Sequence, residues 1–184
     1  MSRARLFAKA SGVLSGVDVA EETFRTIDPS IKFISSAGEG CRVTKGDLVL
    51  TVEGRARALL AAERTALNFL AHLSGVATLT ARFVEAVAGS GVRILDTRKT
   101  TPGMRLLEKR AVRSGGGMNH RVGLYDMVLM KENHIRAAGG ISKAIAACHE
   151  YLRLRGLTGL KIEVETTCEE DVREALAAGC DRIM

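Results

Sequence analysis

Leu160-Lys161-Ile162-Glu163-Val164-Glu165, followed by a helical pattern over residues 169–178, decides the fold class of this chain. The first stretch has the alternating polarity of a strand, and the second has the periodicity of a helix. The same order occurs earlier along the chain. The predicted elements are strand 92–96, helix 104–114, strand 127–131, helix 141–155 and a strand that opens at Asp181. Repeated βα units predict parallel strands joined by right-handed crossovers.

Residues before 91 follow a different pattern. Between Phe33 and Gly54, short β stretches are separated by turns, and Lys45-Gly46-Asp47 is a candidate hairpin turn. Arg57 to Val87 carries apolar residues near the 3.6-residue period, which predicts a long helix. Ser74-Gly75 is expected to break or kink that helix, because glycine has a low helix propensity.

The two patterns predict an α/β fold that divides near residue 90. Residues 1–90 are expected to form a partial N-terminal α+β domain, and residues 91–184 the first half of an incomplete parallel (β/α) barrel. Three βα units and a strand opening cannot close a barrel, and the pattern stops within a strand at Asp181–Met184. We therefore expect a truncated sequence, whose exposed parallel edge further residues or another chain would cover.

Composition bounds the class of protein. Apolar residues make up 46% of the 184 positions, which indicates a globular chain. No apolar run approaches the roughly 20 residues that span a bilayer, and Met1–Phe7 lacks the apolar core of a signal peptide. The four cysteines contain no Cys-x-x-Cys pair, so we expect reduced thiols. The sequence thus predicts a cytoplasmic protein with no membrane partner.

The net charge of +6 is concentrated in one segment. Residues 98–136 contain nine Lys/Arg and three acids, whereas the remainder has 18 of each. Nucleic acid is not the favoured partner, because aromatic residues are only 4% and tryptophan is absent. Small anionic substrates fit better, although a solvated basic helix face around Lys109, Arg110 and Arg113 would account for part of the surplus.

Functional side chains in a parallel βα fold lie where the strands end. That rule selects the turn Asp96–Gly103 with its cations Arg98 and Lys99, then Lys131, then Glu165. Cations around a common mouth bind carboxylates or phosphates, and arginine can donate two parallel hydrogen bonds to a planar carboxylate. A carboxylate opposite them suits Mg²⁺ or sugar hydroxyls.

Each of these features also has a plain structural interpretation. Arg98-Lys99 could be an exposed loop pair, and Lys131 could bury its stem on Met127–Met130 while Glu132 neutralises its ammonium. Strand alternation puts Glu163 and Glu165 on one face, where buried acids need cations or a hydroxylated ligand nearby. We favour the functional interpretation, because Glu165 ends its strand where this fold class keeps its chemistry.

Gly115-Gly116-Gly117 ends the predicted helix 104–114, and two interpretations stay open. The glycines could form a left-handed helix cap, or a pliable lid that carries Asn119-His120-Arg121 over a ligand. Zinc is not expected at His120 or His134, because neither has a cysteine or a second histidine at ligand spacing.

Five motifs together resemble one family. They are Glu63-Arg64-Thr65-Ala66-Leu67-Asn68 with Leu73-Ser74-Gly75-Val76, Thr97 to Gly103, Asn119-His120-Arg121, Lys131-Glu132-Asn133-His134, and Ile162-Glu163-Val164-Glu165. In order and spacing the chain resembles quinolinate phosphoribosyltransferases, over nearly its whole length. The resemblance implies transfer of a phosphoribosyl group from 5-phosphoribosyl 1-diphosphate to quinolinate, giving nicotinate mononucleotide, CO₂ and diphosphate for NAD synthesis.

The resemblance also implies roles for single residues. Arg98, His120, Arg121 and Lys131 resemble the positions that hold the two carboxylates of quinolinate, with Thr97 beside them. Each of these five residues is therefore an expected substrate-binding residue.

Three further roles rest on the same resemblance. Lys99 resembles the cation that meets the phosphoribosyl diphosphate, so Lys99, Lys131 and Glu165 are the expected catalytic residues. Glu165 resembles a carboxylate near the ribose hydroxyls and a required Mg²⁺, bound directly or through water. Arg64 resembles an arginine that reaches into a neighbouring subunit's site, which implies a homodimer or a higher homo-oligomer.

Departures from the family pattern leave alternatives. The family has a longer N-terminal portion, and it continues beyond Met184 into an aspartate and a glycine-rich phosphate loop, so the chain is expected to be truncated at both ends. The alternatives are a paralogue associated with molybdate transport, an inactive half-barrel, and a basic nucleic-acid binder. The complete Thr97–Gly103 and Lys131–His134 motifs favour quinolinate.

Overall fold

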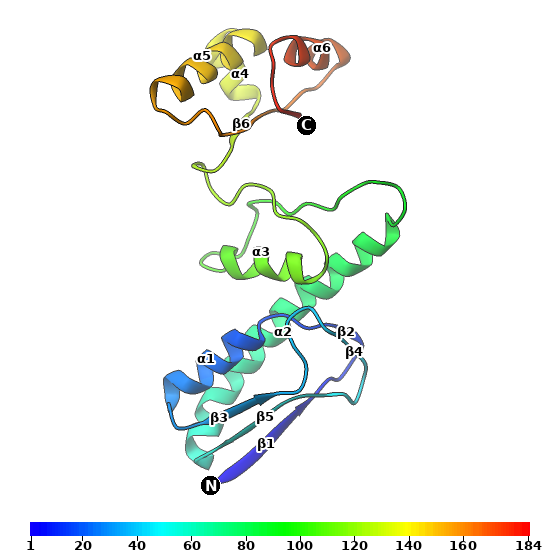
Figure 1. Ribbon diagram of the computed structural model, residues 1–184, viewed down its shortest axis with the longest axis vertical. Helices are drawn as coiled ribbons and strands as arrows, with labels where there is room; N and C mark the ends of the chain where they lie inside the picture. Colours follow the sequence, from blue (N-terminus) through cyan, green and yellow to red (C-terminus); the bar gives the residue numbers. More distant parts are fainter. The chain divides into compact units, whose positions relative to one another are not determined.

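The computed structural model describes all 184 residues, in two compact units, Met1–His120 and Arg121–Met184 (Figure 1). The first unit contains β1 (Ser2–Phe7), β2 (Gly12–Val13), α1 (Val17–Ile27), β3 (Lys32–Ser35), β4 (Arg42–Val43), β5 (Leu48–Gly54), α2 (Ala56–Ala86) and α3 (Arg105–Ser114). The second contains β6 (Val128–Met130), α4 (Glu132–Ala138), α5 (Ile141–Leu154), β7 (Ile162–Val164), α6 (Glu169–Ala177) and β8 (Arg182–Ile183). No helix is long and apolar enough to cross a membrane.

The core of the first unit lies between an antiparallel sheet and two helices. The strand order is β1-β5-β3, and the central β5 buries Val49, Leu50 and Val52. Figure 1 shows α1 and α2 on one face of this sheet, where Phe24 and Leu70 join the same apolar cluster. Burial of each such side chain contributes about 1.5–3 kcal/mol.

The turn at Lys45-Gly46-Asp47 forms, but the predicted hairpin is wrong. Gly46 has a φ of 99°, and Asp47 N–H donates to the Thr44 carbonyl at 3.1 Å. The flanking strands do not pair with each other, because β4 pairs with β2 whereas β5 pairs with β1 and β3. The local sequence predicts the turn, but which strands pair depends on residues that are distant in the sequence.

Helix α2 runs unbroken through Ser74-Gly75, contrary to the predicted kink. The Ser74 hydroxyl accepts from Ser15 N–H at 3.1 Å, and Thr78 Oγ1 accepts from Val13 N–H at 2.9 Å. These hydroxyls, one helical turn apart, bind the backbone of the β2 segment along the helix. Contacts with the rest of the unit therefore outweigh the low helix propensity of Gly75.

Residues 91–120 belong to the first compact unit, and the domain boundary near residue 90 stays a prediction. The predicted strand 92–96 is reduced to a single parallel bridge between Leu95 and Met118. A strand needs a partner along its length, and only the Ile94–Asp96 backbone finds one here. The helix predicted over 104–114 is confirmed as α3, which packs against α2.

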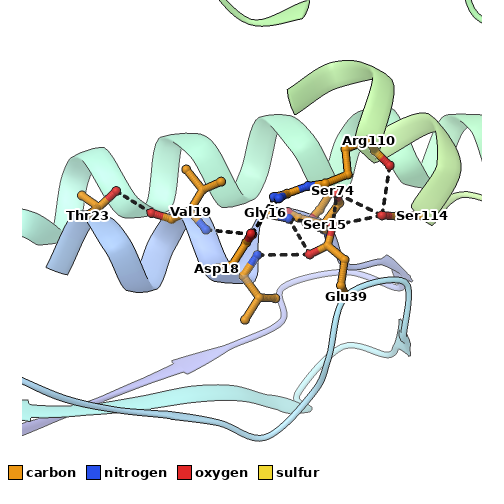
Figure 2. A network of polar contacts seen from close by, with 10 residues as sticks. Ser15, Gly16, Asp18, Val19, Thr23, Glu39, Ser74, Arg110 and Ser114 are labelled. Carbon is orange, nitrogen blue, oxygen red and sulfur yellow. Dashed lines mark hydrogen bonds and ion pairs between the residues drawn. The ribbon is translucent and has the colours of Figure 1, made fainter. Parts of the chain in front are cut away.

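Glu39 joins α1 to the end of α3 (Figure 2). The residue before α1 is Gly16, which has no side chain to cap the helix, and the Glu39 carboxylate accepts from the backbone N–H groups of Gly16 at 2.8 Å and Val17 at 3.3 Å. The same carboxylate accepts from the hydroxyls of Ser15 and Ser114. An anionic acceptor at the start of a helix stabilises it through the unpaired N–H groups and the helix dipole.

The three glycines after α3 form a left-handed cap, as one of the two interpretations predicted. Gly116 has a φ of 85°, Gly117 N–H donates to the Val112 carbonyl at 3.0 Å, and Gly116 N–H donates to that of Arg113 at 2.9 Å. This is the Schellman pattern, which satisfies the last carbonyls of the helix. The lid interpretation stays a prediction.

Replacing Gly115 with alanine should destabilise the first unit by about 1–3 kcal/mol. An added Cβ would collide with the Ala77 carbonyl oxygen and lie 2.8 Å from Thr80 Cβ, so α3 would have to move away from α2. Chemical unfolding followed by circular dichroism measures the loss. Gly89→Ala is not an adequate control, because Gly89 has a φ of 79°, at which alanine is strained. The control is Gly75→Ala, which should not destabilise the chain, because the space around an added Cβ is open there.

The second unit confirms the predicted βα repeat. Its sheet is parallel with the order β6-β7-β8, and Figure 1 shows α4, α5 and α6 together on one side of the strands. Met130, Ile162 and Val164 face Ile141 and Ile145 in an apolar cluster. The short helix α4 was not predicted, because the residues after β6 were assigned only to a loop.

Candidate functional site

Two predicted residues meet at the end of the parallel sheet. Lys131 follows β6 and Glu165 follows the neighbouring β7, and the Glu165 N–H donates to the Met130 carbonyl at 2.9 Å. Lys131 is exposed and Glu165 is half-buried. Because adjacent parallel strands end at the same edge, the structure brings these two predicted residues together, as the sequence indicated.

The sheet face opposite the helices carries an acid and a base side by side. Leu129, Glu163 and Arg182 are in register across β6, β7 and β8, so their side chains share one face. Glu163 is only 5% exposed, and its Oε2 lies 3.9 Å from Arg182 Nη1. A buried carboxylate requires such a cation. Because β7 ends at Val164, the predicted common face of Glu163 and Glu165 stays a prediction. Arg182 was missed because only its strand had been recognised.

Lys131 differs from its predicted environment. Its side chain is exposed, so the expected burial of its stem is wrong: β6 ends at Met130, and Lys131 already caps α4. The Lys131 N–H donates to His134 Nδ1 at 3.1 Å. Glu132 does not neutralise Lys131, since its carboxylate pairs with Arg136 at 2.6 Å. Nδ1 of His134 must carry a lone pair to accept this hydrogen bond.

Arg121 is half-buried at the other end of β6. Its Nη1 donates to the Met127 carbonyl at 3.3 Å. The loop between them is held by Asp126, whose carboxylate accepts from Val122 N–H at 2.7 Å and from Gly123 N–H at 2.8 Å. Arg121 therefore lies next to an ordered turn before β6, whereas Lys131 lies after the last residue of β6.

A buried ion pair organises the candidate site of the first unit. Asp96 Oδ1 accepts from Lys109 Nζ at 2.5 Å and from His120 N–H at 2.8 Å, and its Oδ2 accepts from the Asn119 amide at 2.6 Å. Lys109 Nζ also donates to the His120 carbonyl at 2.9 Å. The side chains of Lys109 and Asp96 are 3% and 8% exposed. The expected solvated helix face is therefore wrong at Lys109, and the His120 backbone is fixed beside the Asp96–Gly103 turn.

The turn presents its two predicted cations differently. Arg98 is half-buried, and its Nε is buried without a hydrogen-bond partner. Lys99 is exposed, and its N–H donates to Thr97 Oγ1 at 3.1 Å, which closes a short side-chain turn. Gly103 follows with a φ of 77°. Thr97, Arg98, Lys99 and His120 thus come together around one anchored turn.

Arg64 does not join that group. It is exposed on α2 and lines a groove between α2 and the β1–β2 segment, with Leu67 and Asn68. The pocket that connects α2 to the beginning of α3 is lined instead by Thr65, Asn68, Phe69, His72 and Met104. Within its own unit, Arg64 is available for contact with another molecule.

Comparisons with known proteins decide the family. The family model "Quinolinate phosphoribosyl transferase, N-terminal domain" matches residues 1–74, and "Quinolinate phosphoribosyl transferase, C-terminal domain" matches residues 76–184. The chain belongs to the quinolinate phosphoribosyltransferase family. The predicted resemblance and the predicted α/β fold class are both confirmed.

Quinolinate phosphoribosyltransferase relatives resemble the chain over nearly all its residues. Probable carboxylating nicotinate-nucleotide pyrophosphorylases are 48% identical over 99% of the chain in Synechocystis and 43% identical over 98% in Bacillus subtilis. The chain spans 60% and 61% of the length of these relatives.

Solved structures of the quinolinate phosphoribosyltransferase family agree with the fold. The crystal structure of NadC from Streptococcus pyogenes has 46% identity and a TM-score of 0.93, over 99% of this chain and 63% of that one. The nicotinate-nucleotide pyrophosphorylase from Francisella tularensis has 39% identity and a TM-score of 0.94, over 100% and 64%.

Proposed function

We propose that this chain serves phosphoribosyl transfer from 5-phosphoribosyl 1-diphosphate to quinolinate, with decarboxylation, in NAD synthesis. Membership of the family and the names of its relatives support this reaction. The observation on the chain itself that carries the proposal is the turn with Arg98 and Lys99, which the buried Asp96–Lys109 pair anchors. Such a turn holds cations ready for a small dianion.

The proposed substrate-binding residues act on the two carboxylates of quinolinate. Arg98 is half-buried, and its guanidinium can donate two parallel hydrogen bonds to a carboxylate. Thr97 precedes Arg98 in the turn, Asp96 fixes the His120 backbone beside that turn, and Arg121 and Lys131 would supply further cations. Desolvated and oriented in this way, the ring nitrogen of quinolinate is held for attack on the ribose carbon.

The proposed reaction needs no side-chain nucleophile. The ring nitrogen forms a bond to C1 of the ribose while the bond from C1 to the diphosphate oxygen breaks, and Lys99 meets the negative charge that develops on diphosphate. The carboxylate next to the ring nitrogen then leaves as CO₂, its bonding electrons remain on the ring carbon, and a proton takes its place. Glu165 would stabilise the positive charge that develops on the ribose.

The carboxylates of the chain are better suited to an Mg²⁺ that is also bound by substrate phosphates than to an Mg²⁺ bound by protein side chains alone. No group of three His, Cys, Asp or Glu that could hold a metal occurs in the chain. Mg²⁺ commonly binds to one or two carboxylates together with substrate phosphates, and Glu165 at the strand end can be one of them. Bound there, the ion would neutralise charge on the diphosphate leaving group.

We also propose a homodimer or a higher homo-oligomer in the cytoplasm. Exposed Arg64 supports it, because an arginine without a partner in its own unit is free to enter the site of a neighbouring subunit. Subunit mixing tests this: a chain with Arg64→Ala and one with Arg98→Ala should complement each other, since one of the mixed sites is then intact.

The test of the reaction measures both binding and product. The chain is incubated with quinolinate, 5-phosphoribosyl 1-diphosphate and Mg²⁺ beside the Synechocystis relative, and nicotinate mononucleotide is separated by chromatography. Saturable quinolinate binding that is lost in Arg121→Ala supports the proposal. Salt-dependent DNA binding without quinolinate binding would instead support a nucleic-acid binder and contradict it.

A further inference from the structure

Two side chains of α3 hold the backbone of the cationic turn. Arg105 donates from Nε to Thr100 Oγ1 at 3.3 Å and from Nη2 to the Arg98 carbonyl at 3.4 Å. Glu108, one helical turn further, accepts from Thr101 N–H at 3.1 Å through Oε2. Residues three apart on a helix project on the same side, so the pair faces the turn with a donor and an acceptor.

Glu108 is itself fixed from a second helix. Its Oε1 lies 2.8 Å from Nε2 of His72 on α2, and the Glu108 side chain is only 12% exposed. Burial by itself raises the pKa of Glu108, but the hydrogen bonds from Thr101 and His72 outweigh burial and bring this pKa below its usual value. The carboxyl group is therefore ionised at neutral pH and is a strong acceptor for the Thr101 N–H.

We propose that Arg105 and Glu108 are positioning residues that set the conformation of the turn, and through it the affinity for the anionic substrate. This inference rests on the proposed function. Both residues bind backbone or hydroxyl groups of the turn, so they leave the side chains of Arg98 and Lys99 for a ligand. The geometry holds the turn in its binding conformation before the ligand arrives, which lowers the entropy cost of binding.

The position of Arg98 shows why such support is needed. A buried N–H group without an acceptor costs free energy, so an unsupported turn would rotate Arg98 toward water or toward another acceptor. Arg105 opposes this movement by binding the carbonyl of Arg98 itself. Glu108 fixes the turn three residues later, immediately before Pro102, whose own φ is restricted.

The experiment compares Glu108→Ala with Glu108→Gln in the full chain. Glutamine keeps an oxygen acceptor for Thr101 N–H and an amide group that can donate to His72, whereas alanine keeps neither. Amide hydrogen exchange at Thr101 and calorimetric binding of quinolinate are measured on each protein. In Glu108→Ala we expect exchange at Thr101 to rise and quinolinate affinity to fall, each by about tenfold, with most of both restored in Glu108→Gln.

A matched control removes a glutamate that supports no turn. Glu150 is exposed on α5 and pairs only with Arg153, so Glu150→Ala should change neither quantity. Unchanged exchange at Thr101 in Glu108→Ala would overturn the proposed support. Faster exchange with unchanged quinolinate affinity would overturn its role in binding. If the unaltered chain binds no quinolinate, the proposed function fails, and exchange at Thr101 still decides whether Glu108 holds the turn.

Discussion

Replacing Lys109 with methionine should lower the free energy of unfolding of the first unit by about 3–5 kcal/mol. Methionine has a similar length, but it leaves the Asp96 carboxylate buried without its cation. It also removes the donor to the His120 carbonyl, so the link between the turn and residues 119–120 weakens at two points. The measurement is urea unfolding followed by circular dichroism.

A double variant separates the charge from the packing. Asp96→Asn with Lys109→Met removes both charges, so it should recover part of the stability lost in Lys109→Met alone. The control is Arg136→Met, which breaks the exposed pair with Glu132 and should change stability by less than about 1 kcal/mol. Equal losses for Lys109→Met and Arg136→Met would show that the buried pair does not anchor the turn.

Replacing Arg98 with alanine should weaken quinolinate binding by about 30-fold to several thousand-fold, which corresponds to the 2–5 kcal/mol typical of a buried charge pair that loses one partner. Arg98→Lys should restore little of this, because an ammonium cannot make two parallel hydrogen bonds to a carboxylate. The folded state should survive, since only the backbone carbonyl of Arg98 is used to hold the turn.

Isothermal calorimetry with quinolinate measures this loss of affinity, and Arg113→Ala is its matched control. Arg113 is an exposed cation on α3, so the variant lowers the net charge by the same amount without altering the turn. Similar affinity in Arg98→Ala and the unaltered chain would remove Arg98 from the substrate site. An equal loss in both variants would mean that the protein attracts the dianion only through its overall charge.

Local periodicity predicted the elements whose partners lie close in sequence. Helix α3 and the strand ends at Lys131 and Glu165 follow from alternation of apolar and polar residues within short windows. The predicted strand 92–96 failed for the opposite reason. Its apolar run is suited to a strand, but only one neighbouring segment pairs with it, at Leu95 and Met118.

The chemistry of the site was harder to predict than its location. A lysine on a predicted helix surface is usually solvated, and the sequence around Lys109 does not indicate that Lys109 forms an ion pair with Asp96. Arg182 was overlooked for a similar reason, because the acid that it pairs with, Glu163, belongs to a different strand. Ion pairs between distant segments depend on the complete fold, which a local pattern does not contain.

The contacts of Glu39 matter for the design of libraries in which positions of this chain are mutated at random. By surface area it is exposed, and a library that protects only buried positions would vary it freely. Its carboxylate nevertheless accepts from Ser15 and Gly16 before α1 and from Ser114 at the end of α3, so it links two stretches of the first unit that lie far apart in sequence. Tolerance to mutation at exposed positions of this protein should therefore be judged by the hydrogen bonds that a side chain accepts as well as by its burial.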